Sequence, residues 1–280
     1  PDCMVVILPT PIIDQFADTI ACPGETITFI DFTTNTVGAT YDWTNSNDSI
    51  GLPSSSSGHL GTWVAPNNET GNYVTGTIIV TSDLGGCPAQ MDFDITVKPT
   101  PLIDSIADMR LCPETNVNTI ALTSNTNSST VFSWENDETA IGLGSLGTGD
   151  IQPWITATNT TDNEINGLIT IASELESCKD TFEFIITLKP TPKADPLDSI
   201  SVCPGGQIVI DQFTSITSSS TTYEWISSNN GIGLSGSGIG DLISPWYAPE
   251  NETGDSIKGN ICVIPTLEGC IGDTMCFVVS

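Results

Sequence analysis

The stretch MDFDITVKPTP, residues 91–101, decides the fold, because an alternating segment runs directly into a proline-rich stop. Its apolar side chains occupy every second position, at Met91, Phe93, Ile95 and Val97. The residues between them are polar, and this period of two is typical of a half-buried β-strand. The same alternation precedes Lys-Pro-Thr-Pro at residues 189–192. The stretch therefore marks the last strand of a unit that occurs more than once.

Working outward from this strand, the whole chain repeats itself with a period of 90 to 92 residues. Each unit has one Cys-Pro cysteine, two tryptophans and a later cysteine. The Cys-Pro cysteines are Cys22, Cys112 and Cys203, and the later ones are Cys87, Cys178 and Cys270. The tryptophans are Trp43, Trp134 and Trp225, followed by Trp63, Trp154 and Trp246. A period this long corresponds to one small domain, not to a solenoid unit.

Within each unit the pattern predicts several short strands and almost no helix. A β-branched run and a short turn at residues 83–88 precede the last strand, which predicts a β-hairpin. Further strands are expected at residues 26–32 and 207–213, and around the first tryptophan. The Gly- and Ser-rich middle, such as residues 143–149, is expected to be loop. The sequence therefore predicts an all-β chain of three antiparallel sandwiches, joined by short proline links into a rod.

The composition excludes some partners. The chain has 34 acidic and 6 basic residues, a net charge of -28. Nucleic-acid binding needs clustered Lys and Arg, so this balance argues against it and against an anionic membrane surface. Hydrophobic residues make up 38%, which favours folded domains over a disordered coil. No apolar run is long enough for a membrane span.

The cysteines predict an oxidising compartment. Each unit holds a pair separated by 65 to 67 residues, so three intradomain disulfides are expected: Cys22–Cys87, Cys112–Cys178 and Cys203–Cys270. Zinc is the alternative, but the chain has no CxxC motif and one histidine. Cys262 and Cys276 flank the last hairpin, and a cross-strand disulfide is expected there. Cys276 is expected on the inward face, where Ile261 and Val263 compete with Cys262.

The combined motif resembles the PKD-like repeats of very large Bacteroidota surface proteins, among them gliding and attachment adhesins and filamentous appendages. It comprises Cys-Pro-Gly, Tyr-x-Trp, Ile-Gly-Leu, Asn-Glu-Thr-Gly, Gly-Cys and Phe-x-Ile-Thr-Val-Lys-Pro-Thr-Pro. The resemblance implies an Ig-like fold, export, and a role in adhesion or as a stalk. The expected units are residues 10–99, 100–190 and 191–280. Residues 1–9 align with a last strand, so they are expected to belong to a preceding repeat, and Cys3 to have no partner in this chain.

Two kinds of modification or ligand are expected near the links. Asp14, Asp104 and Asp195 each lie eight residues before a Cys-Pro cysteine, and such carboxylates either bind calcium or are ordinary solvated acids. Short Asp-Ser/Thr motifs look like the O-glycosylation signal of Bacteroidota. The expected acceptors are Thr19, Ser49, Ser105, Ser199 and Ser256, with Thr274 as a further match.

No catalytic motif stands out. Two GxGxxG segments, at residues 142–147 and 231–236, lack the strand and helix that a dinucleotide site needs. His59 has no partner for acid–base chemistry. The tryptophans either form the cores or stack on carbohydrate. We therefore expect a non-enzymatic segment of a long extracellular surface filament or adhesin. Its partners are expected to be repeats of its own chain, a homo-oligomeric bundle, or a surface glycan or protein. The alternative is a carbohydrate-binding module of a secreted enzyme.

Overall fold

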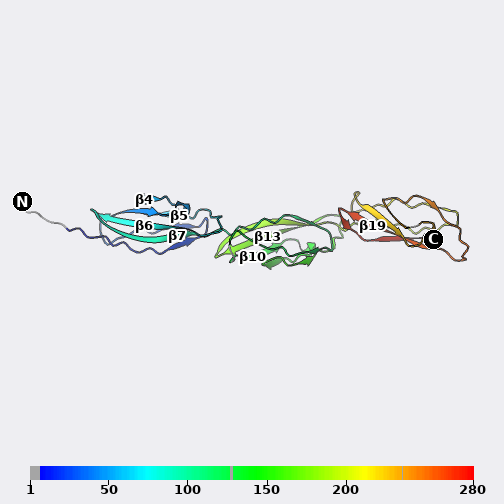
Figure 1. Ribbon diagram of the computed structural model, residues 1–280, viewed down its shortest axis with the longest axis horizontal. Helices are drawn as coiled ribbons and strands as arrows, with labels where there is room; N and C mark the ends of the chain where they lie inside the picture. The colour runs from blue at the N-terminus through cyan, green and yellow to red at the C-terminus, as the bar shows by residue number, and fades with distance from the viewer. Residues whose placement is uncertain (1–6, 127–128, 235) are drawn as a thin grey trace, which may run out of the picture.

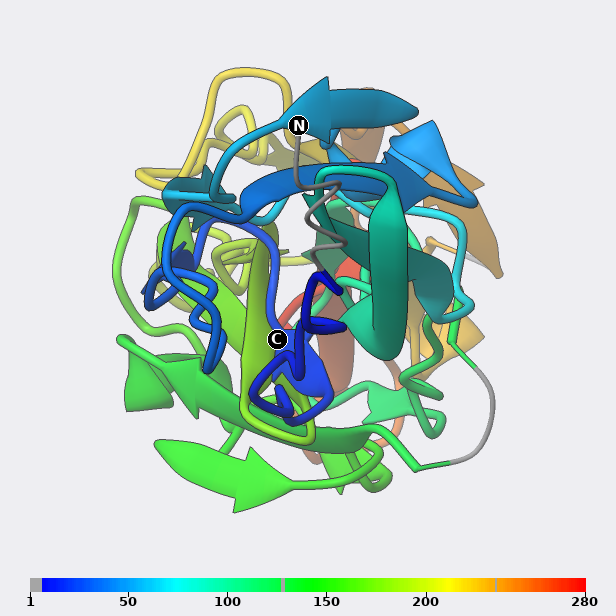
Figure 2. The same cartoon turned by 90° about the vertical axis from the view of Figure 1, so that its left-hand side faces the viewer.

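The computed structural model describes residues 7–126, 129–234 and 236–280. Three β-sandwiches follow one another along a single long axis (Figure 1). Viewed along that axis they lie behind one another, and the second is turned about the axis relative to the first (Figure 2). The described residues contain strands and short 3₁₀ turns but no α-helix. Among them no helix is long and apolar enough to cross a membrane.

The first repeat forms a five-stranded sheet with the order β1-β7-β6-β3-β4. The edge strand β1 runs parallel to β7, and the other neighbours are antiparallel. A second, two-stranded sheet pairs β2 with β5. The strands are β1 (Thr19–Ala21), β2 (Thr26–Thr28), β3 (Thr40–Asn45), β4 (Ser55–Ser57), β5 (Thr62–Val64), β6 (Val74–Leu84) and β7 (Cys87–Val97).

The second repeat has the same plan, with the sheets β11-β10-β13-β14-β8 and β12-β9. Its strands are β8 (Met109–Leu111), β9 (Asn116–Val117), β10 (Val131–Asn136), β11 (Leu146–Thr148), β12 (Trp154–Ile155), β13 (Ile165–Leu175) and β14 (Cys178–Leu188). The third repeat pairs β15 with β18 and forms the sheet β17-β16-β19, with β20 and β21 both paired to β19. These are β15 (Gln207–Ile208), β16 (Thr222–Ser227), β17 (Ser237–Ile239), β18 (Trp246–Tyr247), β19 (Gly259–Leu267), β20 (Cys270–Ile271) and β21 (Met275–Val279).

Each repeat encloses its own hydrophobic core between the two sheets. The three clusters of buried residues share no member. In the first, Trp43, Ile78 and Phe93 lie between the layers. The alternation that predicts the last strand is therefore confirmed: Met91, Phe93, Ile95 and Val97 are all buried. The two sheets of each repeat lie within the range predicted for that unit, and the exact unit boundaries stay predictions.

Two expectations about the strands are wrong in detail. The strands expected at residues 26–32 and 207–213 are only three and two residues long, β2 and β15. The middle of each repeat is not all loop, since a 3₁₀ turn there leads into a short edge strand, β4, β11 or β17. Glycine is used here for close packing, because Gly147 of β11 lies directly opposite Trp134. The expected fourth-repeat strand falls mostly on residues 1–6, and it lies with Cys3 outside the described residues.

Candidate functional site: the interdomain junctions

The two cysteines of each repeat lie at opposite ends of its sandwich. The register pairs Ala21 with Val97, so Cys22 follows at the end where β7 finishes. Cys87 is the first residue of the same strand, ten residues earlier. At about 3.3 Å per residue, the two ends of β7 are roughly 33 Å apart. A disulfide needs Cα atoms within about 7 Å, so these two cysteines cannot bond within one repeat.

The disulfides instead connect consecutive repeats. Cys22 bonds to Cys178, with Cα atoms 5.4 Å apart, and Cys112 bonds to Cys270, with Cα atoms 5.3 Å apart. The expected intradomain pairs are therefore wrong: the Cys-Pro cysteine of one repeat pairs with the hairpin cysteine of the next.

The remaining cysteines have different outcomes. Among the described residues, Cys87 and Cys203 have no disulfide partner, which corrects their expected pairing. The expected bond between Cys262 and Cys276 is present, joining directly opposed residues of β19 and β21. These two lie on the outward side of the sheet, while their neighbours Ile261 and Phe277 are buried, so the expected inward position of Cys276 is wrong.

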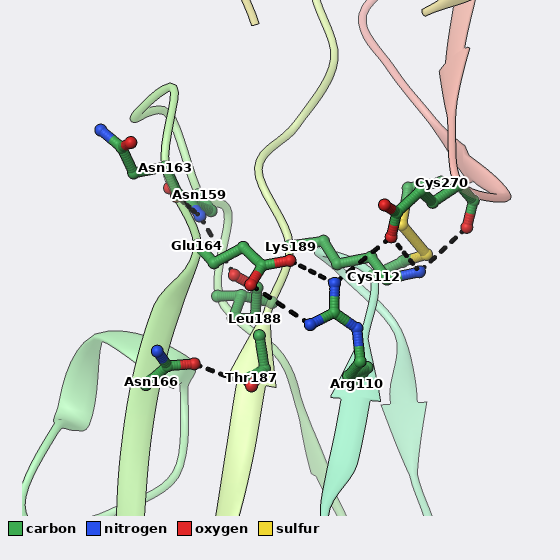
Figure 3. Close-up of polar contacts among 11 residues, drawn as sticks. Arg110, Cys112, Asn159, Asn163, Glu164, Asn166, Thr187, Leu188, Lys189 and Cys270 are labelled. Atoms are coloured by element: carbon green, nitrogen blue, oxygen red, sulfur yellow. Dashed lines mark hydrogen bonds and ion pairs between the residues drawn. A yellow bond between two sulfur atoms is a disulfide. The ribbon is translucent and has the colours of Figure 1, made fainter. Parts of the chain in front are cut away.

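Ion pairs surround the disulfide of the second junction (Figure 3). Lys189 Nζ donates to the carbonyl oxygen of Glu268 at 3.0 Å and lies 3.3 Å from its carboxylate. Arg110 bonds the carboxylate of Glu164 and lies 3.4 Å from that of Glu268. Hydrogen bonds from Lys189 and then Arg110 lower the pKa of Glu268, because both cations favour its charged form. The second and third repeats are thus joined by ion pairs as well as by a disulfide.

The first junction uses the same lysine contact with different neighbours. Lys98 Nζ donates to the carbonyl oxygen of Glu176 at 2.8 Å and lies 3.5 Å from its carboxylate. Burial and a hydrogen bond to Glu176 raise the pKa of Tyr73. Ile20 stands where the second junction has Arg110, and its side chain is 56% exposed. The shared polar element of both junctions is therefore a lysine before the proline link that contacts the hairpin turn of the next repeat.

The same backbone hydrogen bond holds both proline links against the repeat that precedes them. Thr100 N donates to the carbonyl of Asn68 at 2.8 Å, and Thr191 N donates to that of Asn159 at 2.9 Å. The Asn68 amide in turn donates to the carbonyl of Val97 at 3.0 Å. Because the link is bonded to the domain it leaves, it cannot act as a flexible tether.

The few positive charges of the chain gather at these junctions. Of its 6 basic residues, five lie within two positions of a link or a junction cysteine: Lys98, Arg110, Lys179, Lys189 and Lys193. In a chain with a net charge of -28, this placement opposes the repulsion between neighbouring acidic domains.

Each carboxylate considered for calcium accepts a hydrogen bond from a threonine hydroxyl of its own repeat. Asp104 accepts a hydrogen bond from the Thr123 hydroxyl at 2.6 Å, and Asp195 accepts one from Thr214 at 2.6 Å. Asp14 makes the same contact with Thr33. In the described part of the chain, no three acidic, His or Cys side chains come together as a metal site would require. Calcium binding by these carboxylates stays a prediction.

The tryptophans pack inward. Trp43, Trp63 and Trp134 are buried, while Trp154, Trp225 and Trp246 are partly buried against their cores. Trp63 Nε1 donates to the carbonyl of Ile50 and Trp246 Nε1 to that of Ile232, both at 2.8 Å. Indoles held in this way do not form the flat exposed platform on which a sugar would stack, so their placement favours the core interpretation.

The remaining candidates are the glycine segments, His59 and the expected glycosylation acceptors. Gly142 and Gly233 end 3₁₀ turns with φ of 94° and 83°, so the described residues of the GxGxxG segments lie in turns of the sandwich and not in a strand-to-helix nucleotide loop. His59 Nδ1 accepts a hydrogen bond from Phe32 N at 2.9 Å. Of the expected glycosylation acceptors, Ser49, Ser105, Ser199 and Ser256 are exposed, and Thr19 is half-buried in β1. Their modification stays a prediction.

The sequence did contain a signal for the interdomain pairing. The observed pairs are separated by 156 and 158 residues, as regular a spacing as the intradomain one. Constant spacing alone cannot choose between them. The length of the last strand decides against the intradomain disulfides, because it keeps the two cysteines of one repeat too far apart.

No family model matches the chain, and no curated protein is similar to it in sequence. Among solved structures it is similar to titin domains I67-I69 in an E-to-A mutated variant, at 10% identity and a TM-score of 0.48 over 98% of this chain and 99% of that one. Mouse cadherin-23 EC22-24 is 15% identical, with a TM-score of 0.39 over 97% and 98% of the two chains. Drosophila OTK extracellular domains 3-5 are 13% identical, with a TM-score of 0.35 over 98% and 96%. The sheets described above make this chain a tandem array of Ig-like β-sandwich domains.

Proposed function

We propose that this chain is a structural and adhesive segment of a long extracellular filament or adhesin on a bacterial surface. The observation that carries the proposal is the pair of disulfides that bond each repeat to the next. A disulfide inside a domain stabilises that domain, whereas one between domains stabilises their arrangement. A rod that keeps its arrangement suits a spacer that holds something away from a surface.

Other features support this function. Three disulfides indicate an oxidising compartment, as found outside the cytosol. The net charge of -28 keeps such a rod soluble and separated from its neighbours. The proline links are held by backbone hydrogen bonds, so the length of the rod is set by its domains.

Small-angle X-ray scattering tests the stiffness on which the proposal depends. We expect the variant Cys112→Ser/Cys270→Ser to show a broader distribution of interdomain distances than the unaltered chain. The matched control is Cys262→Ser/Cys276→Ser, which removes a bond inside the third repeat and should leave the interdomain distances unchanged. Equal scattering from all three proteins would show that the junction disulfides do not stiffen the rod.

Immunogold electron microscopy of the source cells tests the location. Antibodies against this chain should label filaments outside the cell envelope, and cells that lack the gene should lose both the filaments and their attachment to surfaces. Labelling confined to the cell interior would contradict the proposal, and unchanged attachment would remove the adhesive part of it.

A further inference from the structure

We propose that the two ends of this array carry complementary halves of a third junction, and that each half bonds covalently to a further repeat of the same type. Cys203 would pair with the hairpin cysteine of a following repeat, and Cys87 with the Cys-Pro cysteine of a preceding one. This inference rests on the proposed function as a filament segment. It adds the residues through which the filament continues.

The half at the third repeat has the backbone geometry of the first occupied junction. Cys203 is exposed, and its carbonyl accepts a hydrogen bond from Gly206 N at 2.9 Å. The carbonyl of Cys22 accepts the matching bond from Glu25 N at 3.1 Å. Val202 N donates to the carbonyl of Ser280 at 2.9 Å, which holds Cys203 beside the end of the last strand. This is the position from which Cys22 and Cys112 reach the next repeat.

A partly apolar pocket lies next to Cys203. Its lining includes Val202, Pro204, Ile257, Val279 and Ser280. These residues come from the Cys-Pro turn, the last strand and the loop before β19. Gly259 pairs with Val279 as Gly76 pairs with Ile95, so this pocket corresponds to the space that Val97 fills in the core of repeat one, and it belongs to the third repeat itself.

The half at the first repeat is a hairpin turn of the required shape. Gly85 and Gly86 both have positive φ, of 61° and 89°. At the two occupied junctions the equivalent turn residues also have positive φ, with values of 47° for Glu176 and 47° for Glu268. Cys87 follows this turn as the first residue of β7, just as Cys178 begins β14.

An independent contact shows that this turn already receives part of a junction. A Cβ placed on Gly85 would lie 2.6 Å from Leu8 Cδ1, so the Leu8 side chain rests on the turn. Leu8 precedes Pro-Thr-Pro, as Lys98 and Lys189 do. Those lysines rest on Glu176 and Glu268 in the same way. The noncovalent contact is thus present at the first repeat, and the cysteine partner is the missing piece.

The bond forms by thiol–disulfide exchange with a low-molecular-weight disulfide such as oxidised glutathione. The Cys203 thiolate attacks that disulfide, forms a mixed disulfide and releases one glutathione thiolate. The thiolate of the partner hairpin cysteine then attacks the Cys203 sulfur and displaces the second. The two protein thiols lose two protons and two electrons, and one oxidised glutathione becomes two reduced ones.

A tandem fusion of two full chains tests the pairing. Ser280 of the first copy, which corresponds to Thr96, is joined to Ile7 of the second, so that Ile7 and Leu8 take the places of Val97 and Lys98 before Pro-Thr-Pro. Cys3 and Cys87 of the first copy and Cys203 of the second are changed to Ser. One Cys203 and one Cys87 then face each other across the new junction. After equilibration with reduced and oxidised glutathione, peptide mapping without reduction should recover a peptide that links Cys203 to Cys87, and thiol titration should find no free thiol.

The matched control carries Cys87→Ser in the second copy as well, and it should show one free thiol with all other disulfides unchanged. The proposal is overturned if both thiols stay titratable while the internal junction bonds form in both copies. It is also overturned if Cys203 forms dimers between separate molecules instead. Either result leaves the scattering test of the internal junctions untouched, so the failure of this inference and that of the proposed function are distinguishable.

Discussion

A glycine faces a tryptophan ring in two of the three repeats, and this contact shows how single residues shape the sandwich. Gly147 is paired with Trp134, and Gly238 with Trp225. A Cβ on Gly147 would lie 2.2 Å from Trp134 Cζ2, well inside van der Waals contact. Repeat one has Ser56 opposite Trp43, so this register accepts a Cβ once the ring shifts.

Replacing that glycine should destabilise the second repeat. We expect Gly147→Val to lower the free energy of unfolding by about 1–3 kcal/mol, because the buried indole must move in a packed core. Denaturant unfolding followed by tryptophan fluorescence measures this change. Gly144→Ala is the matched control, since a Cβ there meets no atom within 4 Å, and it should leave stability almost unaltered. Equal stability of both variants would show that the ring is not held against the strand.

The carboxylate of Glu268 should make the second junction sensitive to acid. Its pKa lies below the usual 4.5, so its stabilising effect is complete above that value and is lost as the pH falls through the lowered pKa. Glu268→Gln should therefore lower the melting temperature at pH 7, by about 1 °C for an exposed ion pair, and have a smaller effect at pH 3. Glu252→Gln, which removes an exposed charge that has no ion pair with any described residue, is the control. If Glu268→Gln lowers the melting temperature by the same amount at pH 7 and at pH 3, the effect does not come from the charge of Glu268.

At the scale of elements, the long hairpin of each repeat carries the junction on its turn. Its two turn residues both take positive φ, which twists the hairpin correctly but disfavours side chains. Repeats one and three have glycine at the second position, Gly86 and Gly269, whereas repeat two has Ser177 with φ of 78°. The non-glycine turn is therefore strained at a place where it also presents a cysteine.

Exchanging these turn residues should change stability in opposite directions. Ser177→Gly should stabilise the second repeat by about 1 kcal/mol, and Gly269→Ser should destabilise the third by a similar amount. Thermal unfolding of the two variants, with all disulfides verified by mass mapping, measures both effects. If Ser177→Gly is instead destabilising, contacts of the serine side chain matter more than its backbone strain.

The elements differ in how far the sequence could predict them. The hairpin β6–β7 was predictable because one face of β7 is buried from Met91 to Val97, which imposes a clear alternation. The strand β2 is only three residues long, so its pattern is too short to fix its ends. The disulfide partners depend on which end of a strand each cysteine occupies. The register of β1 against β7 decides which end Cys22 occupies, and this register pairs residues that are far apart in the sequence.

At the scale of the whole molecule, the two junction disulfides turn a linear chain into a network. Cys22 and Cys178 form one node, and Cys112 and Cys270 form the other. Three separate stretches of backbone connect these nodes: residues 22–112, 112–178 and 178–270. A break in any one stretch leaves the nodes joined by the other two. Intradomain pairs would give no such protection to the links between domains.

This network predicts that a cut between domains does not separate them. A protease recognition sequence inserted between Ser105 and Ile106 lies outside all three loops that intradomain pairing would close. After cleavage, the protein should migrate as one band without reductant and as two bands with it, because Cys22 stays bonded to Cys178. A second inserted site, between Pro196 and Leu197, should give three fragments that also separate only on reduction. The control variant Cys22→Ser/Cys178→Ser should release residues 1–105 without reductant. If the protein with all its cysteines also released residues 1–105 without reductant, no disulfide would join the first two repeats. The rod would then depend on its peptide links alone.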